Sequence, residues 1–247
     1  MQLRTTVRDC LYVNWAVPRE RLPRLPEGLR YEWHAAGGER LGLVSALLFH
    51  QHGLRSAAMP WARLSYPQFN LRTYVLDDEG VPAVHFGALM VPGWVLPFAR
   101  AAGQPELERG RFLYPRPSRD RGAESWTWRA SARGAFAVTA SQSAPRVGTG
   151  PDLGSWQRTC DHIRRRDRGY VEVAGRLRRI ETTHGATTVW PMAARVTEES
   201  LLRRLFGWRE GDWPEVHSAW LCPEVPLSFE LARAERAALP SSVPATG

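Results

Sequence analysis

The segment at residues 68–76, QFNLRTYVL, gathers the polar side chains most suited to chemistry. Side chains alternate along a strand, so Gln68, Asn70, Arg72 and Tyr74 share one face and apolar residues share the other. A guanidinium in a partly desolvated cavity offers two parallel N–H donors to a carboxylate or phosphate. This pattern predicts an anion-binding site centred on Arg72.

The same face also has a structural interpretation. A buried arginine needs a partner in any case, so Arg72 could bond a carboxylate such as Glu32 or Glu230 while Asn70 bonds backbone. His85, in the run VPAVHFGAL, joins the candidate ligand contacts, although an isolated histidine there is more often a core residue. The residues alone leave both interpretations open.

The spacing of two histidines can indicate a metal site. His50 and His52 lie two apart on one strand face, and His85 is a conceivable third ligand. No HxxxH or carboxylate spacing joins them, however, so packing and solvation explain them better. We predict no metal ion and no cofactor.

The residue types that the sequence lacks exclude whole classes of mechanism. All 33 residues in the lysine-plus-arginine count are arginine, which excludes Schiff-base, pyridoxal-phosphate and Walker-type phosphate-loop chemistry. No GxSxG or GxGxxG motif is present. If the protein is an enzyme, it is expected to be a lyase or hydrolase without a Schiff base.

The three cysteines are Cys10, Cys160 and Cys222. They form no CxxC pair, which favours buried thiols in a reducing cytoplasm.

The net charge of +8 raises the question of an anionic partner. The dense arginine run at residues 164–168 is punctuated by acidic residues, so a solvated helix face explains it better than a nucleic-acid patch. No specific nucleic-acid partner is predicted, because no zinc-finger or helix-turn-helix signature occurs. The uncharged stretch at 80–99 contains three prolines, so a strand, turn and short helix suit it better than a membrane span.

The elements that would position these residues are mostly strands. The run at 40–52 is long and apolar, as expected for a strand buried on both faces. The turn DDEG joins 68–76 and 81–91 into a hairpin, and Gly134 marks the turn of another hairpin at 124–142. Residues expected to be almost fully buried are Leu43, Val44, Ala46, Leu47, Phe49, Leu71, Val75 and Phe86.

Two helices carry clear end signals. One is expected from Ser155 as N-cap to Gly169 just past its end, and another spans 197–207 with Thr197 as cap. The segments 170–182 and 186–196 are expected to pair as strands. About ten strands with three short helices predict an α+β, mainly β fold. We expect a single domain over residues 1–235 and a disordered tail over 236–247.

Five segments carry a resemblance to a known family: YVNWAVP, QFNLRTYV, VPAVHFGAL, GSWQRTCDHIRRRDRGY and VWPM. Over residues 1–232 the chain resembles the YqjF-like proteins, a bacterial family in the acetoacetate decarboxylase-like superfamily. The resemblance implies a closed, twisted β-barrel of mixed and antiparallel strands, with short helices outside and a small central cavity. Acetoacetate decarboxylase uses a lysine Schiff base, so its catalytic residues have no counterpart in this lysine-free chain.

Together these observations predict a protein that binds a small organic anion, such as a keto or hydroxy acid. Conversion of that anion without a Schiff base is one alternative, and a non-catalytic ligand-binding or scaffold role is another. A basic binder of nucleic acid or of an anionic surface is the third. No membrane association is predicted, and a homo-oligomer is left open.

Overall fold

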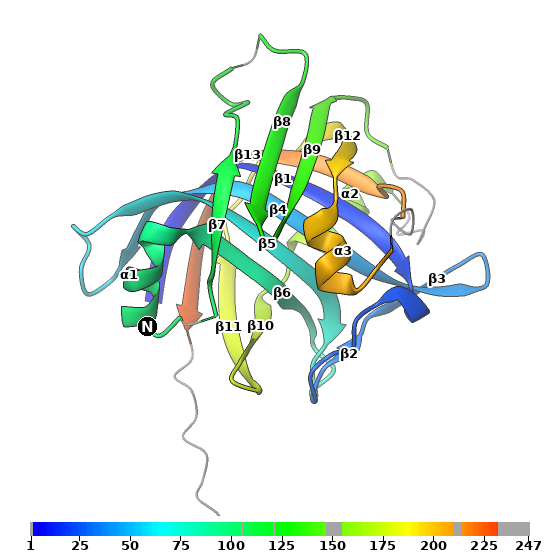
Figure 1. Cartoon of the computed structure of the whole chain (residues 1–247), viewed down its shortest axis with the longest axis horizontal. Coiled ribbons are helices and arrows are strands. Elements are labelled where there is room, and N and C mark those ends of the chain that lie inside the picture. Colours follow the sequence, from blue (N-terminus) through cyan, green and yellow to red (C-terminus); the bar gives the residue numbers. More distant parts are fainter. Residues whose placement is uncertain (1, 105, 121, 147–154, 210–213, 232–247) are drawn as a thin grey trace, which may run out of the picture.

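The computed structural model describes residues 2–104, 106–120, 122–146, 155–209 and 214–231 (Figure 1). No helix in these ranges is long and apolar enough to cross a membrane. The predicted tail at 236–247 lies outside them. The elements are β1 (Gln2–Pro18), η1 (Arg19–Arg21), β2 (Arg30–Tyr31), β3 (Trp33–Ala36), β4 (Glu39–Ser56), β5 (Leu64–Leu76), β6 (Pro82–Pro92), η2 (Gly93–Val95), α1 (Leu96–Ala101), β7 (Glu108–Leu113), β8 (Trp126–Ala132), β9 (Gly134–Gln142), α2 (Trp156–Arg164), β10 (Arg168–Val173), β11 (Arg176–His184), β12 (Trp190–Glu198), α3 (Ser200–Phe206) and β13 (Ser218–Leu231).

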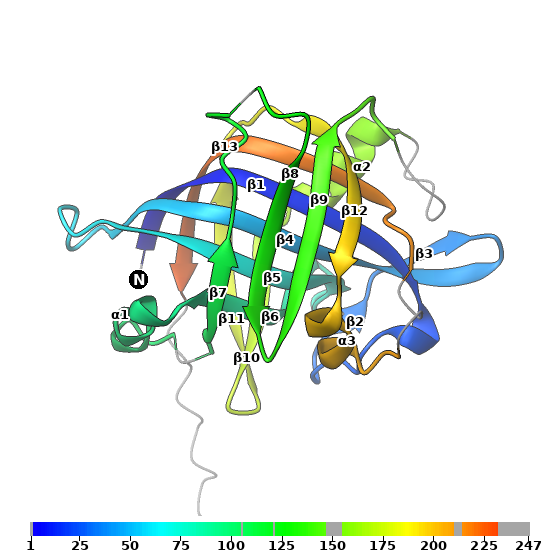
Figure 2. The same cartoon turned by 45° about the horizontal axis from the view of Figure 1, so that its top comes forward.

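Strand pairing forms two circuits that share the long strands. One circuit runs β1–β4–β5–β6–β10–β11–β13 and returns to β1. The other leaves β6 through β7, β8 and β9 to β12, which pairs with β13. Figure 2 shows β7, β8, β9 and β12 crossing over β1, β4 and β5. Over the described residues the fold is mainly β with three short α-helices, as the sequence predicts.

Strand β4 is buried on both faces because it separates two hydrophobic clusters. Val44 and Leu48 face a cluster that includes Trp128 and Phe136 of the crossing strands. Leu43 and Leu47 face the other cluster, where Tyr12, Tyr74 and Trp220 pack against Ile163 of α2. This arrangement explains why the run at 40–52 is apolar without alternation.

Burial confirms the predicted core at every position except one. Leu43, Val44 and Ala46 are fully buried, whereas Phe86 is only partly buried. Phe86 lies beside Gly87, at a shift in the register between β5 and β6. The two predicted hairpins also form, with Gly134 at φ 137° in the second.

The helix starting at Ser155 is shorter than predicted. The Ser155 hydroxyl accepts a hydrogen bond from the Arg158 amide at 3.2 Å, which confirms the N-cap. The helix ends at Arg164, however, because Arg165 has left helical geometry (φ −86°, ψ 87°). Gly169 instead lies in β10.

Two other expectations are wrong. The segment 170–182 holds most of β10 and most of β11, which form a hairpin turning at Ala174 and Gly175. Strand β12 therefore pairs with β9 and β13 rather than with 170–182. Helix α3 begins at Ser200, not after Thr197, because β12 remains paired with β9 as far as Glu198.

Candidate functional site

The polar face of β5 forms as its alternation predicts. Gln68 donates a hydrogen bond to Asn70 at 2.8 Å, and Arg72 donates two to the Tyr74 hydroxyl at 3.1 and 3.0 Å. Arg72 and Tyr74 are buried, with 4% and 0% of their surface exposed. Strand geometry thus brings four of the predicted ligand contacts together.

His85 lies on the other face of the sheet. It stands opposite Thr73 in the β5–β6 pairing, whereas Tyr74 stands opposite Val84. Residues directly opposite each other share a face, so His85 points away from Arg72. Burial lowers the pKa of His85 to about 4, and its Nε2 is buried without a hydrogen-bond partner. The structure therefore separates His85 from the other four residues.

The partners of Arg72 differ from both structural partners that the sequence suggested. Its guanidinium donates to the Ile163 carbonyl at 2.8 Å, in the last turn of α2, where the helix dipole favours a cation. It also lies 5.3 Å from the ring centres of Tyr12 and Tyr74. No carboxylate of the described chain lies within ion-pair distance of it. The arginine therefore fastens α2 to the sheet.

Glu32, one of those suggested partners, pairs with Arg166 instead, at 2.8 Å. Arg164 and Arg166 are buried, so the predicted solvated face is wrong for this run. The cause is the early end of α2, which turns Arg166 inward, while Arg165 remains exposed. The arginine run thus contributes to the interior.

Glu32, His34 and His162 bring their ligand atoms within 4.8 Å of one another, a spacing that could hold a metal ion. A cation already occupies this cluster, because Nη2 of Arg166 lies 2.7 Å from Nε2 of His162 and 2.8 Å from Glu32. Burial and the charge of Arg166 lower the pKa of His162 to about 4. The arrangement fits an arginine-centred structural network.

The three cysteines converge on one cluster although they are far apart in sequence. Cys10 stands opposite Cys222 on neighbouring strands, and Cys160 packs beside them from α2. All three are buried free thiols, as predicted. Burial raises the pKa of Cys160 and of Cys222 to about 12, so these thiols stay protonated and are poor nucleophiles.

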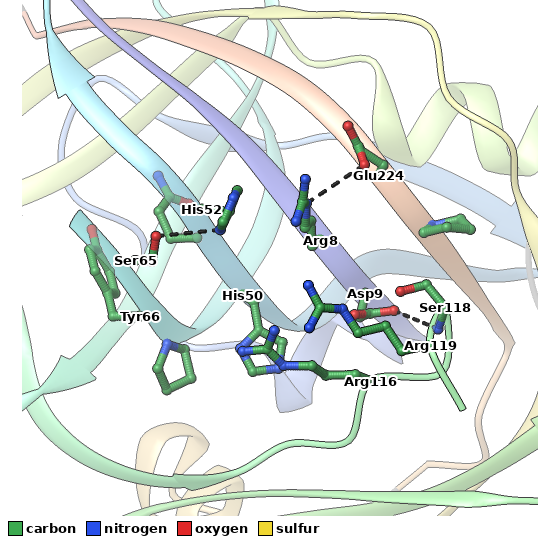
Figure 3. Close-up of a pocket in the computed structure, with 13 residues that line it drawn as sticks. Arg8, Asp9, His50, His52, Ser65, Tyr66, Arg116, Ser118, Arg119 and Glu224 are labelled. Atoms are coloured by element: carbon green, nitrogen blue, oxygen red, sulfur yellow. Dashed lines mark hydrogen bonds and ion pairs between the residues drawn. The ribbon is translucent and has the colours of Figure 1, made fainter. Parts of the chain in front are cut away.

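A pocket of about 380 Å³ lies elsewhere, lined by residues of β1, β4, β5 and β13 and by the segment that follows β7 (Figure 3). Its wall includes a β-bulge in β1, where Arg8 stands opposite His50 and Leu11 opposite Leu48. At the bulge Asp9 has φ 50° and is buried, a conformation that Asp tolerates better than most residues. None of the five ligand contacts predicted from the sequence lines this pocket.

The bulge holds the segment that follows β7 over the pocket. The carboxylate of Asp9 accepts a hydrogen bond from the Ser118 amide at 2.9 Å. Arg116 and Arg119 flank that amide and line the pocket (Figure 3). A single side chain on β1 therefore positions two guanidinium groups that lie more than one hundred residues away.

The lining of the pocket is electropositive. Arg8 lies 3.6 Å from Glu224, the distance of a loose ion pair. Arg116 and Arg119 form no ion pair within the described chain. Asp9 is already engaged by the Ser118 amide. The lining holds three arginines, Arg8, Arg116 and Arg119, against two carboxylates, Asp9 and Glu224, so it retains an excess guanidinium charge that can bind a carboxylate or phosphate.

His50 and His52, which the sequence raised as a metal pair, both line the pocket, whereas His85 does not. Burial lowers the pKa of His50, and the charges of Arg116 and Arg119 lower it further. The pKa of His52 is also lowered. Both imidazoles are therefore largely uncharged at neutral pH.

A family model matches residues 4–226, which is most of the chain. The chain belongs to the DUF2071 family. That family is described as uncharacterized conserved protein. No curated protein matches the sequence.

Similar solved structures identify the fold of this DUF2071 chain. The enduracididine biosynthesis enzyme MppR with HEPES buffer bound has a TM-score of 0.57 and 15% identity, covering 94% of this chain and 87% of that one. MppR complexed with pyruvate has a TM-score of 0.55 and 14% identity, covering 94% and 90%. An acetoacetate decarboxylase-like enzyme from Sphingomonas wittichii RW1 has 0.51 and 16%, covering 93% and 89%. The fold is thus of the acetoacetate decarboxylase-like type, and the narrower YqjF-like name stays a prediction.

Proposed function

We propose that this protein binds a small organic anion, of the keto- or hydroxy-acid class, in the pocket beside the β1 bulge. The observation that carries the proposal is the pair Arg116 and Arg119, which line a pocket of about 380 Å³ and have no carboxylate of the described chain within ion-pair distance. A volume of this size accommodates a small ligand. Two guanidinium groups on one wall would hold its carboxylate.

The fold is consistent with a role in small-molecule binding. Structures of MppR, which shares this fold, hold HEPES buffer or pyruvate. Because this chain has no lysine, any conversion of the ligand would proceed without a Schiff base. The proposal includes the closed barrel expected from the sequence, which the two circuits of paired strands support.

The polar face of β5 is the second candidate site for the same ligand class. What favours it is that Arg72 is buried without a carboxylate in ion-pair distance in the described chain. The bonds from Arg72 to Tyr74 and to the Ile163 carbonyl occupy much of its donor capacity, however. The pocket beside the bulge is therefore the better candidate.

Thermal-shift titration of wild type and single variants with pyruvate, lactate and acetate tests the site. Each charge-assisted hydrogen bond contributes about 1.5–3 kcal/mol, so Arg116→Gln or Arg119→Gln should weaken binding roughly tenfold to a hundredfold. Arg176→Gln is the matched control, because it removes the same charge from an exposed position on β11. It should respond like wild type.

Three results would contradict this assignment. If no small carboxylate raises the wild-type midpoint, the anion-binding function is wrong. If Arg72→Gln folds but loses the response while Arg116→Gln keeps it, the site lies on β5. Salt-steep, nanomolar binding to random duplex DNA would favour the nucleic-acid alternative.

A further inference from the structure

Exposed apolar side chains gather at one end of the molecule. Five large apolar side chains are exposed in the described part of the chain, and four of them lie in the β4–β5 connection and in the η2–α1 segment. Both segments lie at the left of both views (Figure 1, Figure 2). Leu64 at the start of β5 and Leu96 of α1 pack on one hydrophobic cluster, which includes Tyr66. We call the four exposed residues the apolar end: Met59, Trp61, Trp94 and Phe98.

An ordered turn holds Trp61 outward. The Ala62 amide donates a hydrogen bond to the Met59 carbonyl at 3.2 Å, which closes a four-residue turn. Pro60 occupies the second position of this turn, where its fixed φ is favoured. The Met59 amide in turn donates to the Ser56 carbonyl and hydroxyl, at 3.3 and 3.0 Å, which ties the turn to the end of β4. The corner of the turn therefore presents Trp61 to solvent, with 77% of its surface exposed.

The η2–α1 segment turns its larger side chains away from the core. Trp94 and Phe98 are four residues apart and are 52% and 56% exposed, whereas Val95 and Ala99, also four apart, are buried. The ring of Trp94 packs edge-on against Tyr66, with 6.2 Å between ring centres, so its position is fixed. An amphipathic helix normally buries its larger apolar residues. The opposite arrangement indicates a surface that a partner covers.

The surroundings of the apolar end are positively charged. Residues 53–76 and 80–104 contain no aspartate and no glutamate. Arg55 and Arg63 lie on either side of the turn, and Arg100 lies in α1. None of these three arginines forms an ion pair within the described ranges. The cations at this end of the molecule are therefore left for an anionic partner.

Charge decides between the partners that could cover the apolar end. In a symmetric dimer, a two-fold contact would place the same arginines of two copies together. Arg4 already stands directly opposite Arg55 in the β1–β4 pairing, which adds to the repulsion. One exposed carboxylate, Glu108 at the start of β7, leaves the arginines in excess. An anionic bilayer surface instead attracts arginine and accommodates tryptophan at its interface.

We propose that the apolar end docks on the surface of an anionic phospholipid bilayer. Trp61 and the Trp94–Phe98 face enter the interfacial region, while the arginines beside them contact the lipid headgroups. The contact is peripheral, with the protein lying on the bilayer. The sequence predicts no membrane association, because the exposure of these side chains is a property of the fold. The proposal is independent of the anion pocket.

Vesicle flotation tests the docking. Wild type is mixed with vesicles of equimolar phosphatidylcholine and phosphatidylglycerol, or of phosphatidylcholine alone. It should bind the anionic vesicles more tightly, and added salt should weaken this binding by screening the charges. Each arginine near an anionic surface contributes a factor of roughly five, so the double variant Arg55→Gln and Arg63→Gln should bind roughly 25-fold more weakly. Trp61→Ala should bind roughly tenfold more weakly, because it removes a large apolar side chain.

Two matched controls lie outside the apolar end. Leu113→Ala removes the fifth exposed apolar side chain, at the end of β7, and Arg195→Gln removes an exposed arginine of β12. Both should bind anionic vesicles like wild type.

Quenching of tryptophan fluorescence by brominated lipid reports which surface enters the bilayer. Wild type should be quenched when it binds anionic vesicles that contain this lipid. The double variant Trp61→Phe and Trp94→Phe keeps two aromatic side chains at the apolar end. It should still float with the vesicles but lose most of the quenching, because fully buried tryptophans such as Trp15 and Trp128 stay inside the protein.

Several results would overturn the proposal. One is wild type that binds neither kind of vesicle, or both equally. Another is a folded Trp61→Ala that floats like wild type, or quenching that persists in the double phenylalanine variant. A lipid-free dimer in analytical ultracentrifugation that Trp61→Ala dissociates would assign the apolar end to a second copy of the chain. If Trp61→Ala fails to fold, the quenching experiment decides alone: unquenched wild type on anionic vesicles refutes docking through this end.

Discussion

Arg72 offers the sharpest test of how the interior is held together. In Arg72→Gln, the Tyr74 hydroxyl and the Ile163 carbonyl each lose a charged donor. Hydrogen bonds to charged groups contribute about 1.5–3 kcal/mol each. Two such interactions give about 3–6 kcal/mol, of which the shorter glutamine amide can recover only part. We therefore expect the free energy of unfolding to fall by about 3–5 kcal/mol.

Urea titration at neutral pH, followed by tryptophan fluorescence, measures this loss, and thermal unfolding checks it. For a chain of this size, 1 kcal/mol corresponds to roughly 2–4 °C in Tm, so the midpoint should fall by roughly 6–20 °C. Arg165→Gln is the matched control. Its side chain is 70% exposed and lies 3.5 Å from Asp161, so the change should stay within about 0.5 kcal/mol.

A loss below about 1 kcal/mol for Arg72→Gln would refute the view that Arg72 fastens α2 to the sheet. The same variant also separates the structural and ligand-binding interpretations of the β5 face. If Arg72 is structural, the substitution lowers the free energy of unfolding of the unliganded protein, and the folded protein still responds to the anion. If Arg72 contacts the ligand, the substitution weakens the response to the anion and changes the stability of the unliganded protein little.

Three further changes probe the core, a tight turn and an acid-sensitive contact. Leu47→Ala deletes a core side chain and should cost about 2–5 kcal/mol in urea, whereas Leu113→Ala at an exposed position should cost less than about 0.5 kcal/mol. Gly134→Ala should cost about 1–3 kcal/mol, because Gly134 has φ 137° and a Cβ there would lie 3.0 Å from the Leu201 backbone; a neutral result would contradict this packing. Burial would raise the pKa of Asp77, but bonds from the Val81 amide, Arg168 and Tyr170 lower it. Its depressed pKa makes a stabilising contribution that is present above its unfolded pKa of about 4 and lost as pH falls through the folded value. Asp77→Asn should therefore lower stability at pH 7 and flatten the acid limb of the stability curve; an unchanged limb would exclude Asp77 as its source.

Much of the sheet could be predicted because its signals are local. Alternation placed Gln68, Asn70, Arg72 and Tyr74 on one face, and the apolar run at 40–52 indicated a strand buried on both faces. Turn and cap residues such as Gly134 and Ser155 also act within a few residues of their position. These patterns do not identify the partner of a polar side chain.

The arginine run shows how that limit produced an error. Charge patterning treats Arg164 and Arg166 as members of a solvated helix face. The decisive contact of Arg166 is with Glu32, 134 residues away, and it forms only because the helix ends at Arg164. The sequence likewise could not show that Arg72 is held by a carbonyl of α2 rather than by a carboxylate.

The pocket was missed for the same reason, and its origin explains why. It depends on a bulge at Asp9, and Asp adopts positive φ often enough that nothing in the sequence marks this residue. The bulge aims a carboxylate at the Ser118 amide, 109 residues away, and so brings Arg116 and Arg119 to His50. A pattern search that asks which residues share a strand finds His50 and His52 but not these arginines. The chemistry of the pocket arises from the irregularity in β1, as is common where a bulge redirects side chains toward a functional surface.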